Sequence, residues 1–412
     1  MSKIEELIKT FCPNGVEYKD LGNIATYVRG VTYNKKQEIN DSRIKGVKLL
    51  RANNITLETM ALNFNEVKLI SEKVKIKDEQ YLKKDDILIC AGSGSRQHIG
   101  KVAYIDSDMD YTFGGFMAVI RCEKSLLPRY LFHLLTGTLF EDYLNRALNS
   151  ATINNLNASI MSNFSIPFPP VEVQEEIVRI LDKFTAMSEK LNAELELRKK
   201  QYEYYREKLL ISSEKEIENK KFKDIGSFFG GLSGKSKADF IDGNAKFITY
   251  MNVYSNPSIN LKIEDMVRID EGEKQNTIAY GDVLFTTSSE TPDECGMSSV
   301  VTEYPKEKFY LNSFCFGFRM NDLSLYNVDF LKHLFRSKSM RKAICRCASG
   351  VTRFNVSKKK LEEITIPFPP VEVQEEIVRI LDKFTALIEK LNQEITFVQK
   401  QYEYYRDKLL TF

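Results

Sequence analysis

Several short polar loops of this sequence gather side chains that can hold a charged, hydrogen-bonding ligand. They lie in YVRGVTYNKK, LLRANNIT and AGSGSRQHIG in the first half, and in GLSGKSK, LFTTSSETPDECG and GVTRFN in the second. Guanidinium and amide groups pair with base edges, and hydroxyl and ammonium groups hold phosphates. We therefore predict nucleic-acid contacts for Arg29, Lys35, Lys36, Arg51, Asn53, Asn54, Ser93, Ser95, Arg96, Gln97, Lys235, Ser236, Lys237, Asn252, Ser288, Ser289, Arg353 and Asn355.

Basic residues are unevenly divided between the two halves. The formal net charge is only +2, yet residues 332–360 contain ten lysines and arginines and no acidic residue. The matching stretch of the first half has one arginine together with Glu141 and Asp142. We expect the second half to hold phosphates more strongly. A single loop arginine or asparagine can also be merely solvated, so the prediction rests on the whole set.

Two glycine-containing stretches resemble the loops of enzymes. ILICAGSGS looks like a strand followed by an S-adenosylmethionine-binding loop, and FFGGLSGKS ends like a phosphate-binding loop. A true cofactor fingerprint opens a helix, whereas HIGKVAYI after the first stretch has the pattern of a strand. In the second stretch the required first glycine is Phe229. An enzyme that binds S-adenosylmethionine or a nucleotide is thus the weaker alternative, and we predict no cofactor and no catalytic residues.

The histidines and cysteines give no sign of a metal centre. His133 and His333 occupy matching places in apolar, helix-like runs, which is typical of core residues with satisfied hydrogen bonds. Cys345 and Cys347 have no second pair at metal-ligand spacing. The chain has seven cysteines in all, no apolar run of membrane-spanning length and no signal-peptide pattern. We expect reduced thiols and a cytoplasmic protein without a metal.

The chain repeats itself with a period of about 200 residues. IPFPPVEVQEEIVRILDKFTA stands at 166–186 and again at 366–386, and 36 of 45 positions are identical between 166–210 and 366–410. Fainter matches precede it: YKDLGNI with FKDIGSF, DDILICA with GDVLFTT, PRYLFHLL with VDFLKHLF, and SATINN with GVTRFN. Each repeat is therefore a diverged globular part followed by a nearly unchanged tail.

Each tail has the pattern of a long helix. The prolines of PFPP are compatible only with a helix start, and apolar residues then recur at steps of three and four from Val173 to Leu209 and from Val373 to Leu409. One such helix would be roughly 60 Å long. The linker after the first helix is short, so the second globular part begins near that helix's far end. An antiparallel pair fits this connection better than a parallel pair.

These features predict an α+β protein with two globular α/β domains separated by two long antiparallel helices in a pseudo-two-fold repeat. We expect target-recognition domains at residues 1–165 and 213–365, and long helices at 166–212 and 366–412. A symmetric pair of domains matches the two-fold symmetry of duplex DNA. Because the two domains differ in sequence, they would read different half-sites.

CPNGVEYKDLGNI near the start, GVTRFN leading into IPFPPVEVQEEIVRILDKF, and the repeat itself resemble the specificity subunit of type I restriction–modification systems. The resemblance covers essentially the whole chain. It implies a non-catalytic subunit that selects a bipartite double-stranded DNA site for two adenine methyltransferase subunits, with restriction–translocase subunits in the full complex. SATINN departs from GVTRFN, so the role of Arg353 cannot be carried over to Ile153.

Identity between the tails extends beyond the residues that would face the partner helix. We predict outward-facing, methyltransferase-binding side chains at Glu175, Glu176, Arg179, Lys183, Glu375, Glu376, Arg379 and Lys383. Recent duplication of the gene segment would also produce identical tails, and the two explanations can act together. A coiled-coil scaffold that binds only proteins remains the second alternative.

Overall fold

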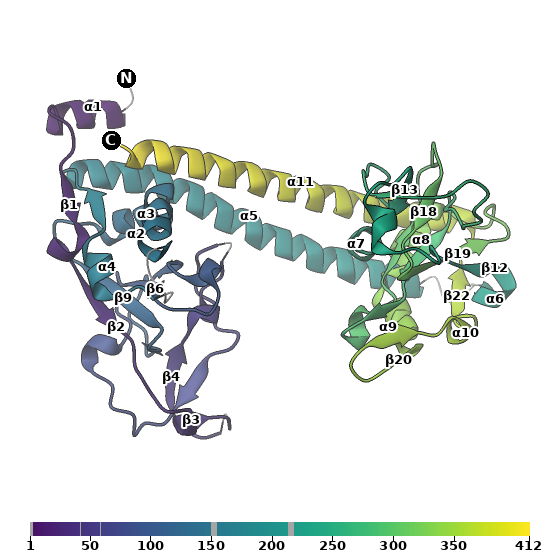
Figure 1. The fold of residues 1–412 in the computed structure, drawn as a ribbon, viewed down its shortest axis with the longest axis horizontal. Coiled ribbons are helices and arrows are strands. Elements are labelled where there is room, and N and C mark those ends of the chain that lie inside the picture. Colours follow the sequence, from purple (N-terminus) through teal and green to yellow (C-terminus); the bar gives the residue numbers. More distant parts are fainter. Residues whose placement is uncertain (1–2, 42, 58, 150–154, 213–217) are drawn as a thin grey trace. The chain divides into compact units, whose positions relative to one another are not determined.

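Each copy of the repeated tail folds into a long helix that begins directly after its prolines. In the computed structural model, α5 spans Val171–Ser212 and α11 spans Val371–Leu410 (Figure 1). The carbonyl groups of Pro170 and Pro370 accept the first helical hydrogen bonds, at 2.9–3.1 Å. Proline disfavours a helical conformation in the residue before it, which fixes where the helix starts. The predicted long helices are confirmed.

The structure describes residues 3–41, 43–57, 59–149, 155–212 and 218–412. The chain divides into two compact units, and both boundaries between them lie within the long helices. Unit 1 consists of Met1–Asn192 with Glu394–Phe412, and unit 2 consists of Ala193–Gln393. Each unit therefore combines one globular part with the first half of its own long helix and the last part of the other.

Unit 1 begins with the helix α1 (Lys3–Phe11) and continues with a mixed α/β part. Its strands are β1 (Tyr18–Asp20), β2 (Ala25–Arg29), β3 (Glu38–Ile39), β4 (Val47–Leu50), β5 (Lys68–Ile70), β6 (Ile87–Cys90), β7 (Val102–Tyr104), β8 (Thr112–Phe113), β9 (Met117–Cys122) and β10 (Ser165–Pro167). Its short helices are α2 (Pro128–Leu135), α3 (Thr138–Asn149) and α4 (Ala158–Ser162).

Unit 2 repeats most of this order of elements, with some additions and without a described counterpart of α1 or β3. Its strands are β11 (Glu218–Lys221), β12 (Gly226–Gly230), β13 (Ala245–Ile248), β14 (Met266–Val267), β15 (Val283–Thr286), β16 (Ser288–Ser289), β17 (Ser298–Val300), β18 (Phe309–Leu311), β19 (Cys315–Met320), β20 (Ala348–Ser349), β21 (Phe354–Val356) and β22 (Thr365–Phe368). Its short helices are α6 (Phe222–Ile225), α7 (Tyr250–Ser255), α8 (Val328–Phe335), α9 (Lys338–Arg346) and α10 (Lys358–Leu361).

The sheets of the two units share most of their topology. Unit 1 has a four-stranded antiparallel sheet in the order β2-β9-β6-β7, and unit 2 has its counterpart in the order β12-β19-β15-β17. A second sheet joins β4 to β5 antiparallel and to β8 parallel, and β13 is joined to β14 and β18 in the same way. The internal repeat is therefore a repeat of fold as well as of sequence.

An ion pair between an arginine and a buried aspartate recurs in the first sheet of each unit. Arg121 on β9 donates to both carboxylate oxygens of Asp86, at 2.7 and 2.9 Å. In unit 2, Arg319 on β19 binds Asp282 in the same bidentate manner. Both aspartates are buried, so each arginine compensates a charge that would otherwise be costly inside the protein.

In unit 1, the buried side chain of His133 connects the globular part to both long helices through hydrogen bonds with Asp182 and Tyr402. We call these three residues the polar joint of unit 1. His133 Nε2 lies 2.8 Å from the carboxylate of Asp182 on α5, and Nδ1 lies 2.9 Å from the hydroxyl of Tyr402 on α11. The carboxylate can only accept, so Nε2 carries the proton and the neutral ring accepts from the tyrosine. Burial lowers the pKa of His133 despite the raising effect of Asp182.

Unit 2 contains the corresponding polar joint. The two contacts are 2.8 Å each, and the joint consists of His333, Asp382 and Tyr202. Burial again lowers the pKa of the histidine. The expectation that His133 and His333 are satisfied core residues is confirmed.

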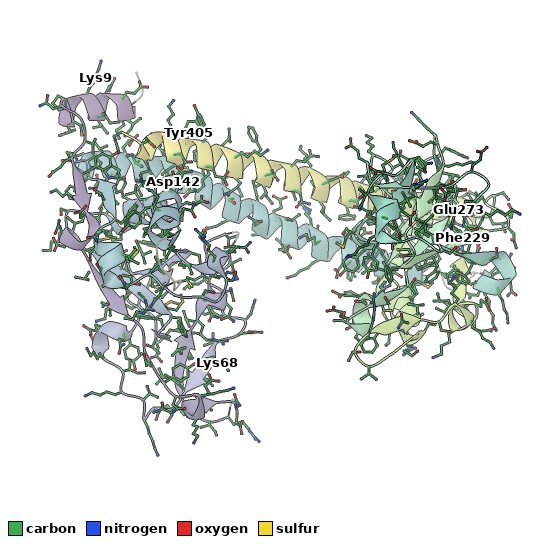
Figure 2. The ribbon with its side chains drawn as sticks, viewed as in Figure 1. Lys9, Lys68, Asp142, Phe229, Glu273 and Tyr405 are labelled. Carbon is green, nitrogen blue, oxygen red and sulfur yellow. The ribbon has the colours of Figure 1, made fainter. Side chains whose placement is uncertain are left out.

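The long helices run antiparallel in each unit. In unit 1, Phe184 of α5 stacks on Tyr405 of α11, labelled in Figure 2, with ring centroids 5.5 Å apart and planes 20° apart. In unit 2, Tyr205 stacks on Phe384 with centroids 5.4 Å apart and the same angle. The start of each helix packs beside the end of the other in both units, as predicted.

Further sequence expectations concern cysteines and membranes. All seven cysteines are free thiols. Among the described residues, no helix is both long enough and apolar enough to span a membrane. The same part of the chain contains no cluster of three or more histidine, cysteine, aspartate or glutamate residues that could hold a metal ion.

Candidate nucleic-acid interface

Unit 1 brings three of its loops together beyond the end of β6. Gly92 forms an isolated antiparallel bridge with Asn155. Arg29, the last residue of β2, lies beside this bridge. Its Nη2 donates to Asn155 Oδ1 at 2.8 Å, its Nη1 to the Leu156 carbonyl at 2.9 Å, and its Nε to the Gly115 carbonyl at 2.8 Å. The guanidinium group therefore holds the loops in place.

Unit 2 has a cleft of about 900 Å³ at the matching place. The strand pair beside it is β16–β21, where Ser288 pairs with Asn355 in the register that Gly92 and Asn155 have in unit 1. The cleft combines aromatic, hydroxyl, carboxylate and guanidinium groups, from Tyr250, Met251, Tyr254, Ser288, Ser289, Glu290, Glu294, Phe314, Thr352 and Arg353. Such a mixture offers both donors and acceptors to a base edge.

Arg353 occupies this cleft in a different way from Arg29 in unit 1. Its Nε donates to Ser288 Oγ at 3.0 Å, and its guanidinium lies 5.4 Å from the centroid of the Phe314 ring. Arg353 is an exposed residue. The counterpart of Arg353 in unit 1 is Ile153, which lies outside the described residues. The two units thus bring an arginine to matching places from different strands.

A carboxylate on the rim of the cleft is held by hydroxyl groups. Glu294 accepts hydrogen bonds from Thr291 at 2.8 Å, from Tyr254 at 3.0 Å and from Ser289 at 3.3 Å. The bonds from Thr291 and Tyr254 lower the pKa of Glu294. The carboxylate is therefore an acceptor at neutral pH, which is the chemistry that pairs with a cytosine amino group.

Most of the other predicted contact residues lie on the surface of their unit. Ser95, Arg96 and Gln97 surround the 3₁₀ turn Arg96–His98, and Lys35 and Lys36 open another such turn. The exposed members of the predicted set are Lys35, Lys36, Asn53, Ser95, Arg96, Gln97, Ser236, Lys237, Arg353 and Asn355, and the half-buried members are Arg29, Arg51, Ser93, Lys235 and Ser289. Ser288 is buried and accepts the hydrogen bond of Arg353.

Two predicted asparagines belong to the fold instead. Asn54 is buried, accepts from the Arg51 N–H at 2.8 Å and donates to the Asn63 carbonyl at 3.1 Å. Asn252 is buried and bonds both backbone groups of Asn260, at 2.8 and 3.1 Å. Both amides cap local turns, so the prediction of nucleic-acid contact is wrong for them. Asparagine is also a common turn residue, because its side chain forms hydrogen bonds with the nearby backbone.

Lys235 is another correction. Its Nζ forms an ion pair with the carboxylate of Glu273, labelled in Figure 2, at 2.5 Å. The lysine side chain is only 7% exposed. The bonds from Lys235 and Gln275 lower the pKa of Glu273 to about 2, so the pair stays charged. A phosphate could reach Lys235 only by breaking this pair, whereas the neighbouring Lys237 is exposed.

Aromatic residues of the interface were not part of the sequence prediction. Tyr250 and Tyr254 on α7 stack with their planes 16° apart, and Phe314 forms part of the cleft. In unit 1, Phe116 is exposed at the place that matches Phe314. Alignment of residues 112–122 with 310–320 would have revealed the two phenylalanines, because the repeat places them opposite each other.

The helix residues predicted to bind the partner divide into two groups. Glu175, Arg179 and Lys183 are exposed. So are their counterparts, at Glu375, Glu376, Arg379 and Lys383. Glu176 is different, because its side chain is only 3% exposed. The prediction that Glu176 faces outward is therefore wrong.

The helix α1 explains the burial of Glu176. Lys3 Nζ lies 2.9 Å from the Glu176 carboxylate, and Arg179 Nε donates to the same oxygen at 2.8 Å. The bonds from Arg179 and Lys3 lower the pKa of Glu176 to about 2. Ile4 of α1 belongs to the same apolar cluster as Val173, which is fully buried. No element among the described residues covers the second copy in this way, and Glu376 is 54% and Val373 40% exposed.

The enzyme-like loops do not have the structure of cofactor loops. After β6, the glycine-containing stretch runs through the 3₁₀ turn Arg96–His98 into the strand β7, as the sequence pattern indicated. The stretch FFGGLSGKS runs from β12 into the 3₁₀ turn Lys237–Phe240. Neither loop opens an α-helix, which is where a phosphate would otherwise be held.

Comparisons with known proteins define the class of this protein. The family model of the type I restriction modification DNA specificity domain matches residues 13–197 and 214–397. These two segments account for most of the chain. The chain therefore belongs to this family, as the sequence resemblance predicted, and each unit carries most of one matched domain. The enzyme and scaffold alternatives are not favoured.

Individual relatives and solved structures agree with this assignment. The chain is 31% identical over 332 residues to the EcoR124I/EcoR124II specificity subunit of Escherichia coli, covering 75% of this chain and 77% of the relative. It is 23% identical over 401 residues to the EcoKI specificity subunit of Escherichia coli K12, covering 93% and 85%. The fold is similar to that of the type I restriction–modification S subunit from M. genitalium, with a TM-score of 0.52, 13% identity and 97% of both chains covered.

Proposed function

We propose that this chain recognises a bipartite, asymmetric site in double-stranded DNA and directs two adenine methyltransferase subunits to it. The observation that supports this most is the pair of loop clusters at matching places in two units of one topology. Their side chains differ: unit 1 presents Arg29 and Asn155, and unit 2 presents Arg353, Glu294 and the tyrosines of α7. Two units with a similar fold but different side chains in their loop clusters fit a DNA site with two different halves.

The exposed polar residues around the clusters supply the remaining contacts. Lys35, Lys36, Arg96 and Gln97 in unit 1 lie on short turns, where they can reach phosphates or base edges. In unit 2, Ser236, Lys237 and Asn355 lie on the surface, and the lysines of α10 add positive charge. Arg353 is the best candidate for a direct base contact, because its terminal nitrogens extend beyond the Ser288 bond.

The chain itself has a positioning role and no catalytic one in this proposal. The methyl transfer belongs to the two partner subunits, which bind the exposed helix residues headed by Glu175, Arg179 and their counterparts. Restriction–translocase subunits complete the assembly, and the protein acts in the cytoplasm. The family assignment supports a role in such a complex.

The decisive experiment is to express the full chain with a type I methyltransferase subunit encoded beside it and to map methylated adenines across a genome. We expect one motif with two unlike specific parts and a gap of fixed length. A continuous motif, or the absence of site-selective methylation, would contradict the proposal.

Exchange of one domain tests whether each unit recognises its own half of the site. Residues 218–365 can be replaced by the corresponding domain of a relative, leaving both long helices unchanged. We expect the new motif to keep one half and the gap and to change the other half. A change in both halves would show that the two units do not read DNA independently.

A further inference from the structure

Each unit exposes a large apolar side chain at the same place beside its loop cluster. Phe116 stands immediately before β9 and is 73% exposed, and Phe314 stands immediately before β19 and is 53% exposed. Single exposed phenylalanines are common on protein surfaces. Two at matching positions of a diverged repeat require a separate explanation.

The segments that carry these residues have otherwise diverged. Residues 112–122 read TFGGFMAVIRC and residues 310–320 read YLNSFCFGFRM. Only two of the aligned positions have the same residue in both segments. One is Arg121 with Arg319, and the ion pairs that these arginines form with buried aspartates account for that identity. The other is Phe116 with Phe314, and neither ring lies in a core that would account for it.

The backbone holds both phenylalanines in a fixed place. The Phe116 carbonyl accepts from the N–H groups of Ala91 and Gly92 at 2.9 and 3.0 Å. The Phe314 carbonyl accepts from the Thr287 N–H at 2.8 Å, in the corresponding position of unit 2. Each ring therefore projects from the residue just before a central strand, where the backbone is hydrogen-bonded to the neighbouring segment. A ring held in this way can contact a ligand without a loop first having to become ordered.

An arginine accompanies the ring in each unit. Arg353 lies over the Phe314 ring. In unit 1, a Cβ on Gly92 would lie 3.1 Å from Phe116 Cδ1 and 3.9 Å from Arg29 Nη2, so ring and guanidinium flank the same glycine. An apolar ring beside a cation suits the stacked bases and charged backbone of DNA.

We propose that Phe116 and Phe314 are apolar wedges that insert against the bases, one in each half of the DNA site. This inference rests on the proposed function. Stacking against a base face is tolerant of sequence, because every base has such a face. That tolerance explains why two domains that read different sequences keep the same residue, while their surroundings supply the discrimination. An apolar contact with a thymine methyl group would instead require the same base in both halves.

The test uses the full complex of this chain with its methyltransferase subunits and the site found by methylation mapping. Duplexes carry 2-aminopurine in one half or the other to report unstacking by fluorescence. The variants are Phe116→Ala and Phe314→Ala. The matched controls are Phe64→Ala and Tyr304→Ala, which remove aromatic rings that are exposed at other places in the same units.

We expect Phe116→Ala to weaken binding about tenfold or more, which corresponds to about 1.4 kcal/mol, and to abolish the fluorescence rise in one half only. Phe314→Ala should do the same in the other half, and both controls should bind like the wild type. If the wild-type complex shows no site-selective binding, the proposed function fails. If it binds and the phenylalanine variants match the controls, the wedge inference alone is overturned.

Two further outcomes would also overturn the inference. Loss of the methyltransferase subunit from Phe116→Ala or Phe314→Ala complexes, with their thermal stability unchanged, would assign the rings to a protein interface. A thymine-to-uracil exchange that reproduces the loss in the wild type would assign them to a methyl contact. Retention of binding by uracil duplexes supports the wedge.

Discussion

Val173 and Val373 stand at the same position of identical 21-residue segments, yet the first is fully buried and the second is 40% exposed. The difference comes from α1, which covers the start of α5 in unit 1 and brings Lys3 to Glu176. Identical sequence thus gives unlike surfaces when one copy receives an additional element. A partner that binds both helices would contact the same charged residues, Glu175 and Arg179 or their counterparts, in the two copies. The apolar residues around those charges would differ in exposure.

The interiors of the two units show the reverse relation. Their globular sequences have diverged, but the polar joint, the arginine–aspartate pair and the strand order are the same. Gln174 and Gln374 also make the same three hydrogen bonds, to the segment before α2 or α8 and to a proline carbonyl. Substitution of a buried polar residue leaves its hydrogen-bond partner unsatisfied, which is costly. The exposed loop residues are not under this constraint and can differ between the units.

The largest effect that we expect comes from breaking one polar joint. His133→Ala removes one hydrogen-bond partner from Asp182, which keeps Arg129, and one from Tyr402, which keeps Thr136. It also opens a cavity, so it should lower the free energy of unfolding of unit 1 by about 2–4 kcal/mol. His333→Ala should do the same to unit 2. Hydrogen-exchange mass spectrometry can resolve the two units, with His98→Ala in a loop as the control. Equal loss of protection in both units after one substitution would contradict this comparison.

Acidification should weaken both joints together. The pKa values of His133 and His333 are lowered in the folded protein by burial, so the unfolded chain binds protons at a pH where the folded chain does not. Stability is therefore complete above about pH 6.5 and falls below it, by up to about 1.4 kcal/mol per pH unit for each histidine. Denaturation from pH 8 to pH 5 measures this slope. A His133→Gln variant should show a smaller slope than the wild type, and an unchanged slope would exclude this origin.

The two interface arginines should respond differently to replacement by lysine. Arg29 bonds several backbone and side-chain groups at once, which a lysine cannot do, so Arg29→Lys should cost about 1–2 kcal/mol of stability. Arg353→Lys should change stability by less than about 0.5 kcal/mol but should relax the motif in one half-site. Chemical denaturation and methylation mapping give the two readouts. A loss of stability in Arg353→Lys equal to that in Arg29→Lys would remove the distinction.

The smallest effect distinguishes the two helix starts. Glu176→Gln removes a buried partner of Lys3 and Arg179, and we expect a loss of about 1 kcal/mol. Glu376→Gln, on the exposed counterpart, should have no measurable effect. Because the pKa of Glu176 is lowered to about 2, its contribution is present above about pH 4.5 and is lost as the pH falls toward 2. Thermal melts at pH 7 and pH 3 test both statements, and the difference between the variants should be smaller at pH 3 than at pH 7.

The sequence predicted the parts of the fold that depend on periodic patterns. Prolines and three–four spacing located both helices, and the short linker after α5 indicated their antiparallel pairing. The repeat indicated two domains of one topology. Such features depend on residues close in the chain or on comparison of the two copies, so one sequence contains them.

Side-chain partners across the fold could not be predicted in this way. Nothing near Glu176 shows that Lys3 reaches it from 173 residues away. Likewise, Lys235 looks like a solvated loop lysine until the fold brings Glu273 beside it. Loop composition predicted where an interface lies, but Asn54 and Asn252 show that it does not distinguish a turn-capping amide from a reading one.

The polar joint of unit 1 also concerns the order in which the protein is made. His133 and Tyr402 are 269 positions apart in the chain, so the tyrosine is synthesised after the whole of unit 2. In the joint of unit 2, Tyr202 and His333 are 131 positions apart, and Asp382 follows His333 by 49 positions. A nascent chain can therefore complete its second reading unit first. Unit 1 can complete its joint only after Tyr402, near the end of α11, has been synthesised.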